Sequence, residues 1–547
     1  MRKNSKVTIS IQKRKNYQYS IWIALGFILL MVIIIKIRSL GTPLERDEGE
    51  FAYMGQLILQ GIPPYKIAYN MKFPGIYFIY AFFMSIFGQS VSGVHAGLLV
   101  SNIASIYFLF LLVRKLIGDY AAISATVSFA VLLISFSVYG FAAHATQFVI
   151  FCALAGTFIL FKAVSDNKLK YYFLSGILLG FAPLMKQTGL FFPIFGWIFL
   201  SIILYIKRKS YFKEYSISLL LYSAGVIIPF SILCIILKMY GVFDKFWFWT
   251  IDYAMGFGNQ VNLKDGLFNF MDTFGSLWHG FHFIWIIALS GFGVLFIHPR
   301  LKNDFRSLFT LLFLIFSFLS ICPGLLFRPH YFVTLLPAVS ILFGLSIDYL
   351  WEMSKFNKRQ ILKYISCSLL IISITFGIIS QYDYFFILSP TEIIKKAYNI
   401  NPFPESVPIG EYIKANSNDG DKIAILGSEP QICFYANRHS ATGHITTYAL
   451  MENHKYNLLM QKEMISDIES AMPKYFIYVN ISTSWLMHDY SENYIFNWVD
   501  PFLLKNKYQL KGIVDIFNDR TIYKWDSEVY NYEAKSPYHV LIFRRNG

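Results

Sequence analysis

The sequence predicts a polytopic α-helical membrane protein of about eleven spans that ends in a small extracytoplasmic α/β domain. Of its 547 residues, 55% are hydrophobic and only 15% are charged, which is far more apolar than a soluble globular chain. Apolar runs long enough to cross a bilayer recur along the first 380 residues, and the composition becomes ordinary beyond Tyr384. The apolar composition, the recurring apolar runs and the change after Tyr384 together predict this fold class.

The N-terminus predicts the orientation of the first span. Residues 1–18 carry six Lys and Arg and no acidic residue, and Tyr19–Ile35 is apolar. Basic residues beside a span stay in the cytoplasm, so we expect a cytoplasmic N-terminus. Lys36 and Arg38 stand where a signal peptide would have its small-residue cleavage site, which favours an uncleaved anchor.

Ten further apolar runs complete the predicted membrane domain. They are Val94–Val113, Tyr120–Val138, Ala145–Phe161, Tyr171–Met185, Thr188–Ile206, Tyr215–Leu237, Gly280–Ile297, Leu308–Leu326, Phe332–Leu350 and Tyr364–Ile379. Ile76–Phe87 is too short for a span and is expected to lie at the interface. The resulting topology places 22 Lys and Arg inside and 10 outside before residue 380, so the net charge of +15 reflects orientation. A nucleic-acid partner is not needed to explain it.

We expect three regions. They are a cytoplasmic basic N-terminus (1–18), a transmembrane domain (19–384) with an outer loop at 39–93, and a soluble extracytoplasmic α/β domain (385–547). In the last, Ile409–Ala415 predicts a helix, and strands are expected at Lys422–Leu426, Lys474–Val479, Tyr508–Val514 and His539–Phe543. The five cysteines have no paired spacing, so neither a disulfide framework nor a zinc site is expected.

Polar residues gather on the predicted outer side. The loop after the first span crowds five charges into six positions, Glu45, Arg46, Asp47, Glu48 and Glu50. Charge beside lipid is costly, which indicates a function. Further polar stretches on that side are K-F-P-G at Lys72–Gly75, H-A-T-Q at His144–Gln147, K-Q-T at Lys186–Thr188, the aromatic run Val242–Met255 and F-R-P-H-Y at Phe327–Tyr331. The inner loops hold only scattered, mostly basic residues.

The stretches Leu44–Tyr77 and Phe327–Pro337 resemble the polyprenyl- and dolichyl-phosphate-sugar-dependent glycosyltransferases, the family of protein O-mannosyltransferases and aminoarabinose transferases. The resemblance implies a type C glycosyltransferase-like fold. It also implies an enzyme that transfers a sugar, with inversion, from a polyprenyl-phosphate donor to a lipid A, protein or envelope-glycan acceptor. The reaction would take place at the outer face of a bacterial inner membrane.

The resemblance also assigns residues. Asp47 would be the general base and Glu48 would position the acceptor or a metal. The donor phosphate would be bound by Lys72, Lys186, Arg328, His330 and Tyr331. Three more residues, Arg46, His144 and Gln147, would lie near the site.

No cofactor is required by the pattern. Some relatives use a divalent metal, but the acidic residue that some of them carry just before the loop lysine is Met71 here, so metal use stays open. No glycine-rich phosphate motif is present, and nucleotide binding therefore has no support.

Two other classes of function fit part of the pattern. A transporter or flippase for lipid-linked sugars would also have many spans and a polar cavity, but such proteins usually bind near the midplane between repeated halves. A non-catalytic scaffold would not need charges beside lipid. A glycosyltransferase is the main hypothesis, and the transporter is the alternative.

Overall fold

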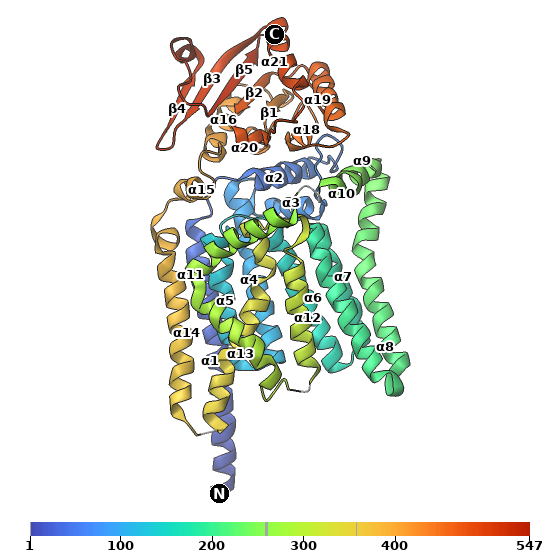
Figure 1. Ribbon diagram of the computed structural model, residues 1–547, viewed down its shortest axis with the longest axis vertical. Coiled ribbons are helices and arrows are strands. Elements are labelled where there is room, and N and C mark those ends of the chain that lie inside the picture. The colour runs from blue at the N-terminus through green and yellow to red at the C-terminus, as the bar shows by residue number, and fades with distance from the viewer. Residues whose placement is uncertain (1, 258–260, 303, 357, 547) are drawn as a thin grey trace. The chain divides into compact units, whose positions relative to one another are not determined.

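The computed structural model describes residues 2–257, 261–302, 304–356 and 358–546 (Figure 1). The chain forms two compact units. The first, called the span unit here, contains Met1–Ser39, Leu98–Leu233 and Asn259–Ile387. The second, called the sheet unit, contains Leu40–Gly97, Cys234–Gly258 and Leu388–Gly547.

Eight helical segments among the described residues are long and apolar enough to cross a membrane. They lie in α1 (Arg2–Arg38), α4 (Val91–Leu116), α6 (Ala145–Asp166), both halves of α8 (Phe191–Met239), α11 (Leu263–Ile297), α13 (Leu336–Phe356) and α14 (Gln360–Ser380). Each coincides with a span that the sequence predicts. The helices of the span unit run roughly alongside one another (Figure 1).

In the described part of the chain, four shorter apolar helices account for the remaining apolar runs. Three coincide with predicted spans, α5 (Asp119–Leu133), α7 (Leu169–Met185) and α12 (Phe305–Leu319). The fourth, α3 (Gly75–Phe87), is the short run expected outside the bilayer. The polytopic helical fold is therefore confirmed.

The long helix α8 folds back on itself. The Tyr222 hydroxyl donates a hydrogen bond to the Pro193 carbonyl at 2.8 Å. In a straight helix these residues would lie about 43 Å apart, at 1.5 Å per residue. The two halves are therefore antiparallel neighbours, as expected for two successive spans.

The helix α11 has a break where the sequence predicts a span to begin. Phe281 has non-helical φ and ψ of −143° and 27°. The predicted span started at Gly280, one residue earlier. The apolar part that follows is thus separated from the amphipathic part that precedes it.

Short turns of 3₁₀ or π helix connect the long helices of the span unit. They are η1 (Phe136–Val138), η2 (Gln187–Leu190), η4 (Pro323–Leu325), η5 (Pro329–Thr334) and η6 (Asp383–Ile387). Two of them, η2 and η5, carry stretches that the sequence singles out.

The sheet unit combines several helices with one sheet. Its helices include α2 (Arg46–Leu59), α3, α9 (Phe243–Trp247), η3 (Phe248–Tyr253), α10 (Ala254–Phe257), α15 (Pro390–Tyr398), α16 (Phe403–Ala415), α17 (Gln431–Ala436), α18 (Tyr448–Met451), α19 (Asn457–Ala471), α20 (Ser482–Trp485), α21 (Tyr494–Lys505) and η7 (Asp526–Asn531). The aromatic run Val242–Met255 is thus helical, with a π turn in its middle.

The sheet has five strands in the order β1-β2-β5-β3-β4 (Figure 1). They are β1 (Ile423–Leu426), β2 (Tyr475–Asn480), β3 (Tyr508–Ile516), β4 (Thr521–Trp525) and β5 (His539–Arg545). Strands β1 and β2 pair in parallel, and the other pairs are antiparallel. The four predicted strands are confirmed, and β4 is an additional strand that the sequence analysis missed.

Candidate active site

The acidic loop forms the start of helix α2. Glu45 is the N-cap, and its side chain accepts from the Glu48 amide at 2.9 Å. The Glu48 carboxylate accepts in turn from the Glu45 amide at 3.3 Å, which completes a capping box. The positive end of the helix dipole favours acidic residues in this first turn, so the charge crowding has a local structural reason.

Asp47 and Glu50 share the ammonium of Lys72. The Lys72 Nζ lies 2.5 Å from the Asp47 Oδ1 and 3.4 Å from the Glu50 Oε2. Glu50 is buried and also accepts from the Tyr77 hydroxyl at 2.7 Å and from the Asn70 amide at 2.6 Å. The Asp47 side chain keeps 37% of its surface exposed. Within this cluster Asp47 is therefore the carboxylate that a substrate can reach.

The electrostatics of the three groups are linked. Burial raises the pKa of Glu50, and the charge of Asp47 raises it further, while Lys72 acts in the opposite direction. For Lys72 burial acts to lower the pKa, but Asp47 and Glu50 outweigh it, and the pKa rises above its usual value. Lys72 is thus a stable cation at neutral pH.

Glu48 contacts a histidine of α4, whereas Asp47 and Glu50 contact Lys72. Its side chain is fully buried, and its Oε1 lies 2.9 Å from the Nε2 of His95 on α4. The other imidazole nitrogen of His95 lies 2.9 Å from the Leu40 carbonyl. Glu48 thus binds the helix start to α4 within the sheet unit, which is a positioning contact.

Arg46 connects α2 to the G-S-E-P-Q stretch before α17. Its Nη2 lies 2.7 Å from the buried Glu429 carboxylate, and its Nε donates to the Ser428 carbonyl at 2.5 Å. The helices approach so closely that a Cβ on Gly49 would lie 2.5 Å from the Gln431 Cβ. Glycine is required there because any side chain would collide with α17. Two stretches far apart in the sequence thus meet in this unit.

A second cluster lies in the span unit and joins three of the predicted polar stretches. The imidazoles of His144 and His330 stack with their centroids 3.9 Å apart. The Lys186 Nζ lies 3.4 Å from the centroid of the Tyr331 ring, in the geometry of a cation–π contact. The stretches around His144, Lys186 and His330 are therefore neighbours, as a common site would require.

The backbone conformation around His144, Lys186 and Arg328 determines where their side chains begin. His144 is the N-cap of α6, but its side chain makes no capping hydrogen bond. Lys186 is an extended residue between α7 and η2. Gly189 allows the tight return of the chain, because a Cβ there would lie 2.3 Å from the Ala182 carbonyl oxygen. Arg328 is extended, as residues before proline usually are, and Pro329 begins η5.

Arg328 and Gln147 differ in their surroundings. Arg328 is exposed and has no ion-pair partner among the residues that the structure describes. Gln147 is fully buried in the first turn of α6, where its Oε1 accepts from the Asn102 amide at 3.0 Å. An exposed guanidinium suits an anionic ligand, whereas Gln147 packs between helices.

Each of the two clusters contains some side chains of the kind that bind metal ions. The carboxylates of Asp47 and Glu50 already share a cation, the ammonium of Lys72. In the span unit the imidazoles of His144 and His330 are of the type that binds divalent transition metals.

The comparisons with known proteins agree with the family resemblance. Residues 71–237 match the family model described as dolichyl-phosphate-mannose-protein mannosyltransferase. The resemblance is confirmed over this stretch. The mannosyltransferase-like stretch contains Lys72, His144, Gln147 and Lys186, while Asp47 and the Arg328–Tyr331 stretch lie outside it. A sequence comparison with curated proteins found no match.

Solved structures support the fold. ArnT from Cupriavidus metallidurans bound to undecaprenyl phosphate is similar with a TM-score of 0.59 and 13% identity, over 92% of this chain and 97% of that chain. The archaeal oligosaccharyltransferase AglB from Archaeoglobus fulgidus, in complex with an inhibitory peptide and a dolichol-phosphate, is similar with a TM-score of 0.53 and 12% identity. That match covers 95% of this chain and 75% of AglB. The type C glycosyltransferase-like fold is confirmed.

Sequence reasoning missed several residues that contact the acidic side chains of α2 in the sheet unit. Asn70 and Tyr77 bind Glu50, and His95 binds Glu48. His95 carried a usable signal, since an ionisable residue inside an apolar helix normally has a specific partner. Asn70 and Tyr77 carried none, because polar residues at such positions are common in loops and at helix ends.

Proposed function

We propose that this protein is a membrane glycosyltransferase that moves a sugar from a polyprenyl-phosphate donor to a hydroxyl or phosphate acceptor. The observation that carries the proposal is the partly exposed Asp47 carboxylate, held by Lys72 at 2.5 Å in a chain with the fold of ArnT. The family match and the undecaprenyl phosphate bound to ArnT support a lipid-phosphate donor.

In the proposed reaction Asp47 acts as the general base. The acceptor oxygen attacks the anomeric carbon of the sugar, and its proton passes to the Asp47 carboxylate. The bond between the anomeric carbon and the phosphate oxygen breaks, and polyprenyl phosphate leaves with the bonding electrons. A single displacement of this kind inverts the anomeric configuration.

The neighbours of Asp47 have positioning roles in this proposal. Lys72 holds the carboxylate, because its ammonium already contacts Asp47 and Glu50. Glu48 and Arg46 fix the start of α2 through His95 and Glu429. Their substitution would act on the rate through the orientation of Asp47.

The span-unit cluster supplies the proposed phosphate site. The departing lipid phosphate carries negative charge that needs cations and hydrogen-bond donors. Lys186 and Arg328 are the proposed cations, and His330 and Tyr331 the proposed donors. His144 supports His330 by stacking, and Gln147 supports α6 by packing.

The proposed location is the outer face of a bacterial inner membrane, with the N-terminus in the cytoplasm and the sheet unit outside. The acceptor would be lipid A, a protein or an envelope glycan. The basic residues of the predicted inner side support this orientation.

The test is sugar transfer by the purified full-length protein in lipid nanodiscs. Labelled polyprenyl-phosphate sugar is supplied with crude envelope acceptors to the wild type, Asp47→Asn and the control Asp244→Asn, whose exposed carboxylate lies on α9. We expect Asp47→Asn to lower the rate by about 10² to 10⁴, and the control to keep it. NMR of the product should show an inverted anomeric carbon.

Two results would contradict the proposal. Equal rates for the wild type and Asp47→Asn would exclude Asp47 as the base. If the wild type transfers no sugar from any polyprenyl-phosphate donor, yet carries lipid-linked sugar across proteoliposomes, the protein is a transporter.

A further inference from the structure

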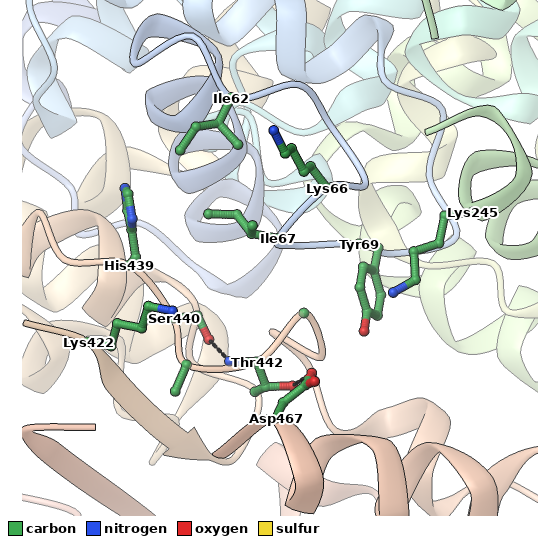
Figure 2. Close-up of a pocket in the computed structure, with 12 residues that line it drawn as sticks. Ile62, Lys66, Ile67, Tyr69, Lys245, Lys422, His439, Ser440, Thr442 and Asp467 are labelled. Atoms are coloured by element: carbon green, nitrogen blue, oxygen red, sulfur yellow. Dashed lines mark hydrogen bonds between the residues drawn. The ribbon is translucent and has the colours of Figure 1, made fainter. Parts of the chain in front are cut away.

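A pocket of about 380 Å³ lies within the sheet unit, next to the loop that precedes Lys72 (Figure 2). Its volume is in the range of pockets that bind small molecules. Neither Asp47 nor any residue of the span unit lines it. The pocket is therefore additional to the two clusters described above.

Three lysines from separate segments surround this pocket. Figure 2 shows Lys66 on the loop after α2, Lys245 on α9 and Lys422 at the start of β1. Lys66 and Lys422 are exposed and have no ion-pair partner among the described residues. Lys245 pairs with Glu463 at 3.2 Å and lies over the Tyr69 ring. Two uncompensated ammonium groups thus border one cavity, which favours an anionic ligand.

The local charge is opposite to that of the surrounding region. The sheet unit, residues 40–97, 234–258 and 388–547, carries 21 basic and 24 acidic side chains, a net charge of −3. A basic pocket wall in an acidic region is not a consequence of composition. It concentrates positive potential where a ligand would enter.

The other polar groups of the pocket suit hydroxyl groups. Asp467 accepts from the Thr442 hydroxyl at 3.0 Å and has further acceptor capacity. Ser440 and His439 also line the pocket, and burial together with Lys422 lowers the pKa of His439, so that its imidazole is neutral at pH 7. A simple anion would be repelled by Asp467. A ligand with one anionic group and several hydroxyl groups satisfies both halves of the pocket.

The pocket is connected to the proposed base by a short stretch of chain. Lys66, Ile67 and Tyr69 line the pocket, and the next residue, Asn70, donates to Glu50 at 2.6 Å. Two residues later Lys72 contacts Asp47 at 2.5 Å. A ligand in the pocket would therefore lie against the loop that positions the base.

We infer that this pocket binds an anionic saccharide, one that carries a phosphate or carboxylate group, and that this saccharide is part of the acceptor. Lys66 and Lys422 bind the anionic group, and Asp467 and Ser440 bind hydroxyl groups of the same sugar. The ligand class rests on the pocket alone, whereas its role as acceptor rests on the proposed glycosyltransferase function.

The first experiment measures binding without catalysis. Calorimetry at low ionic strength compares a hexose phosphate, a hexuronate and the neutral hexose on the full-length protein in nanodiscs. The variants are Lys66→Gln/Lys422→Gln and, as a matched control, Lys414→Gln/Lys505→Gln, which removes two exposed lysines of the same unit outside the pocket. We expect both anionic sugars to bind the wild type and the control, and the pocket variant to bind them about tenfold or more weakly. The relative affinity of phosphate and carboxylate sugars identifies the anionic group.

Several results would overturn the inference. Equal affinity in the pocket variant and the control, or equal binding of the neutral hexose, would exclude an anion site. Tighter binding of an acidic peptide than of either sugar at this pocket would exclude a saccharide.

The second experiment tests the role as acceptor. In the transfer assay we expect the pocket variant to raise the acceptor KM several-fold and to leave the donor KM unchanged. An unchanged acceptor KM would exclude the acceptor role. If the wild type transfers no sugar while the binding pattern holds, the proposed function and the acceptor role fail and the anionic-saccharide site stands.

Discussion

The ammonium of Lys72 lies 2.5 Å from the Asp47 carboxylate and 3.4 Å from the Glu50 carboxylate. One lysine thus holds two acidic residues of the same helix, and only one of the two, Asp47, is substantially exposed. This arrangement separates a carboxylate that can react from one that is buried to support it.

Substitution of Lys72 should lower kcat strongly and change the donor KM only slightly. Without the ammonium the Asp47 side chain loses its fixed position, and two carboxylates lie close together without a cation. We expect Lys72→Gln to lower kcat by about ten- to a hundredfold with donor KM changed little, measured as sugar transfer. Lys72→Arg keeps the charge and should recover part of the rate. A change in donor KM alone would indicate instead that Lys72 binds the donor phosphate.

The Arg46–Glu429 pair should show strong coupling. Both side chains are nearly inaccessible, at 11% and 0% exposure, so removing one leaves the other as a buried charge. We expect Arg46→Met and Glu429→Gln each to destabilise the protein by about 3 kcal/mol, and the double variant by much less than the sum. Chemical denaturation of the four proteins in one detergent measures the cycle. Additive effects would show that the pair does not act as a unit.

Replacing a helical glycine by alanine should change the stability in opposite directions at Gly49, where α2 touches α17, and at Gly275 on α11, where there is open space. A Cβ at Gly49 would lie 2.5 Å from the Gln431 Cβ and 2.8 Å from its backbone nitrogen, whereas a Cβ at Gly275 meets nothing within 4 Å. We expect Gly49→Ala to destabilise by about 1–3 kcal/mol and Gly275→Ala to be neutral or to stabilise by up to about 1 kcal/mol. Thermal unfolding of both variants checks the sign. Equal effects would mean that α2 moves away from α17 at little cost.

Much of the fold was predictable because its signals are local. Apolar runs gave the spans, and even the start of one span at Gly280 agrees with the break at Phe281. Strand β4 was missed because T-I-Y-K-W at Thr521–Trp525 is only five residues long and does not alternate strictly between polar and apolar residues. It pairs with β3 in a hairpin across the turn at 517–520, and its side chains are only half-buried, so burial leaves no clear alternation in its sequence.

The sequence pointed to some residues of the candidate site, but it did not predict their contacts. Charged residues such as Asp47 and Lys186 stand out in an apolar sequence whatever their partners are. That Lys72 binds Asp47, or that His144 stacks on His330, depends on packing between distant segments. A single sequence contains no measure of such distances.

Glu463 should make the sheet unit sensitive to acid. Its hydrogen bond to His444 lowers the pKa of Glu463 to about 2, against the opposing effect of burial. A carboxyl group with a lowered pKa stabilises the fold above its unfolded value of about 4.5, and this contribution is lost as the pH falls from there toward 2. Since 41% of the side chain is exposed, screening limits the effect to about 1 kcal/mol or less. The decrease in unfolding temperature from pH 6 to pH 3.5 should be smaller for Glu463→Gln than for the wild type. An equal decrease in both proteins would contradict this assignment.

The contact between Lys186 and Tyr331 allows the role of the ring to be separated from that of the hydroxyl. The Nζ lies 3.4 Å from the ring centroid, so the aromatic face orients the ammonium. If Lys186 binds the donor phosphate, Lys186→Gln should raise the donor KM about tenfold or more, because a charge-assisted contact is lost. Tyr331→Phe keeps the ring and should keep the lysine in place, whereas Tyr331→Leu should resemble Lys186→Gln. Initial rates over a range of donor concentrations measure both constants. A donor KM that is raised by Tyr331→Phe as much as by Tyr331→Leu would assign the binding to the hydroxyl group rather than to the lysine that the ring orients.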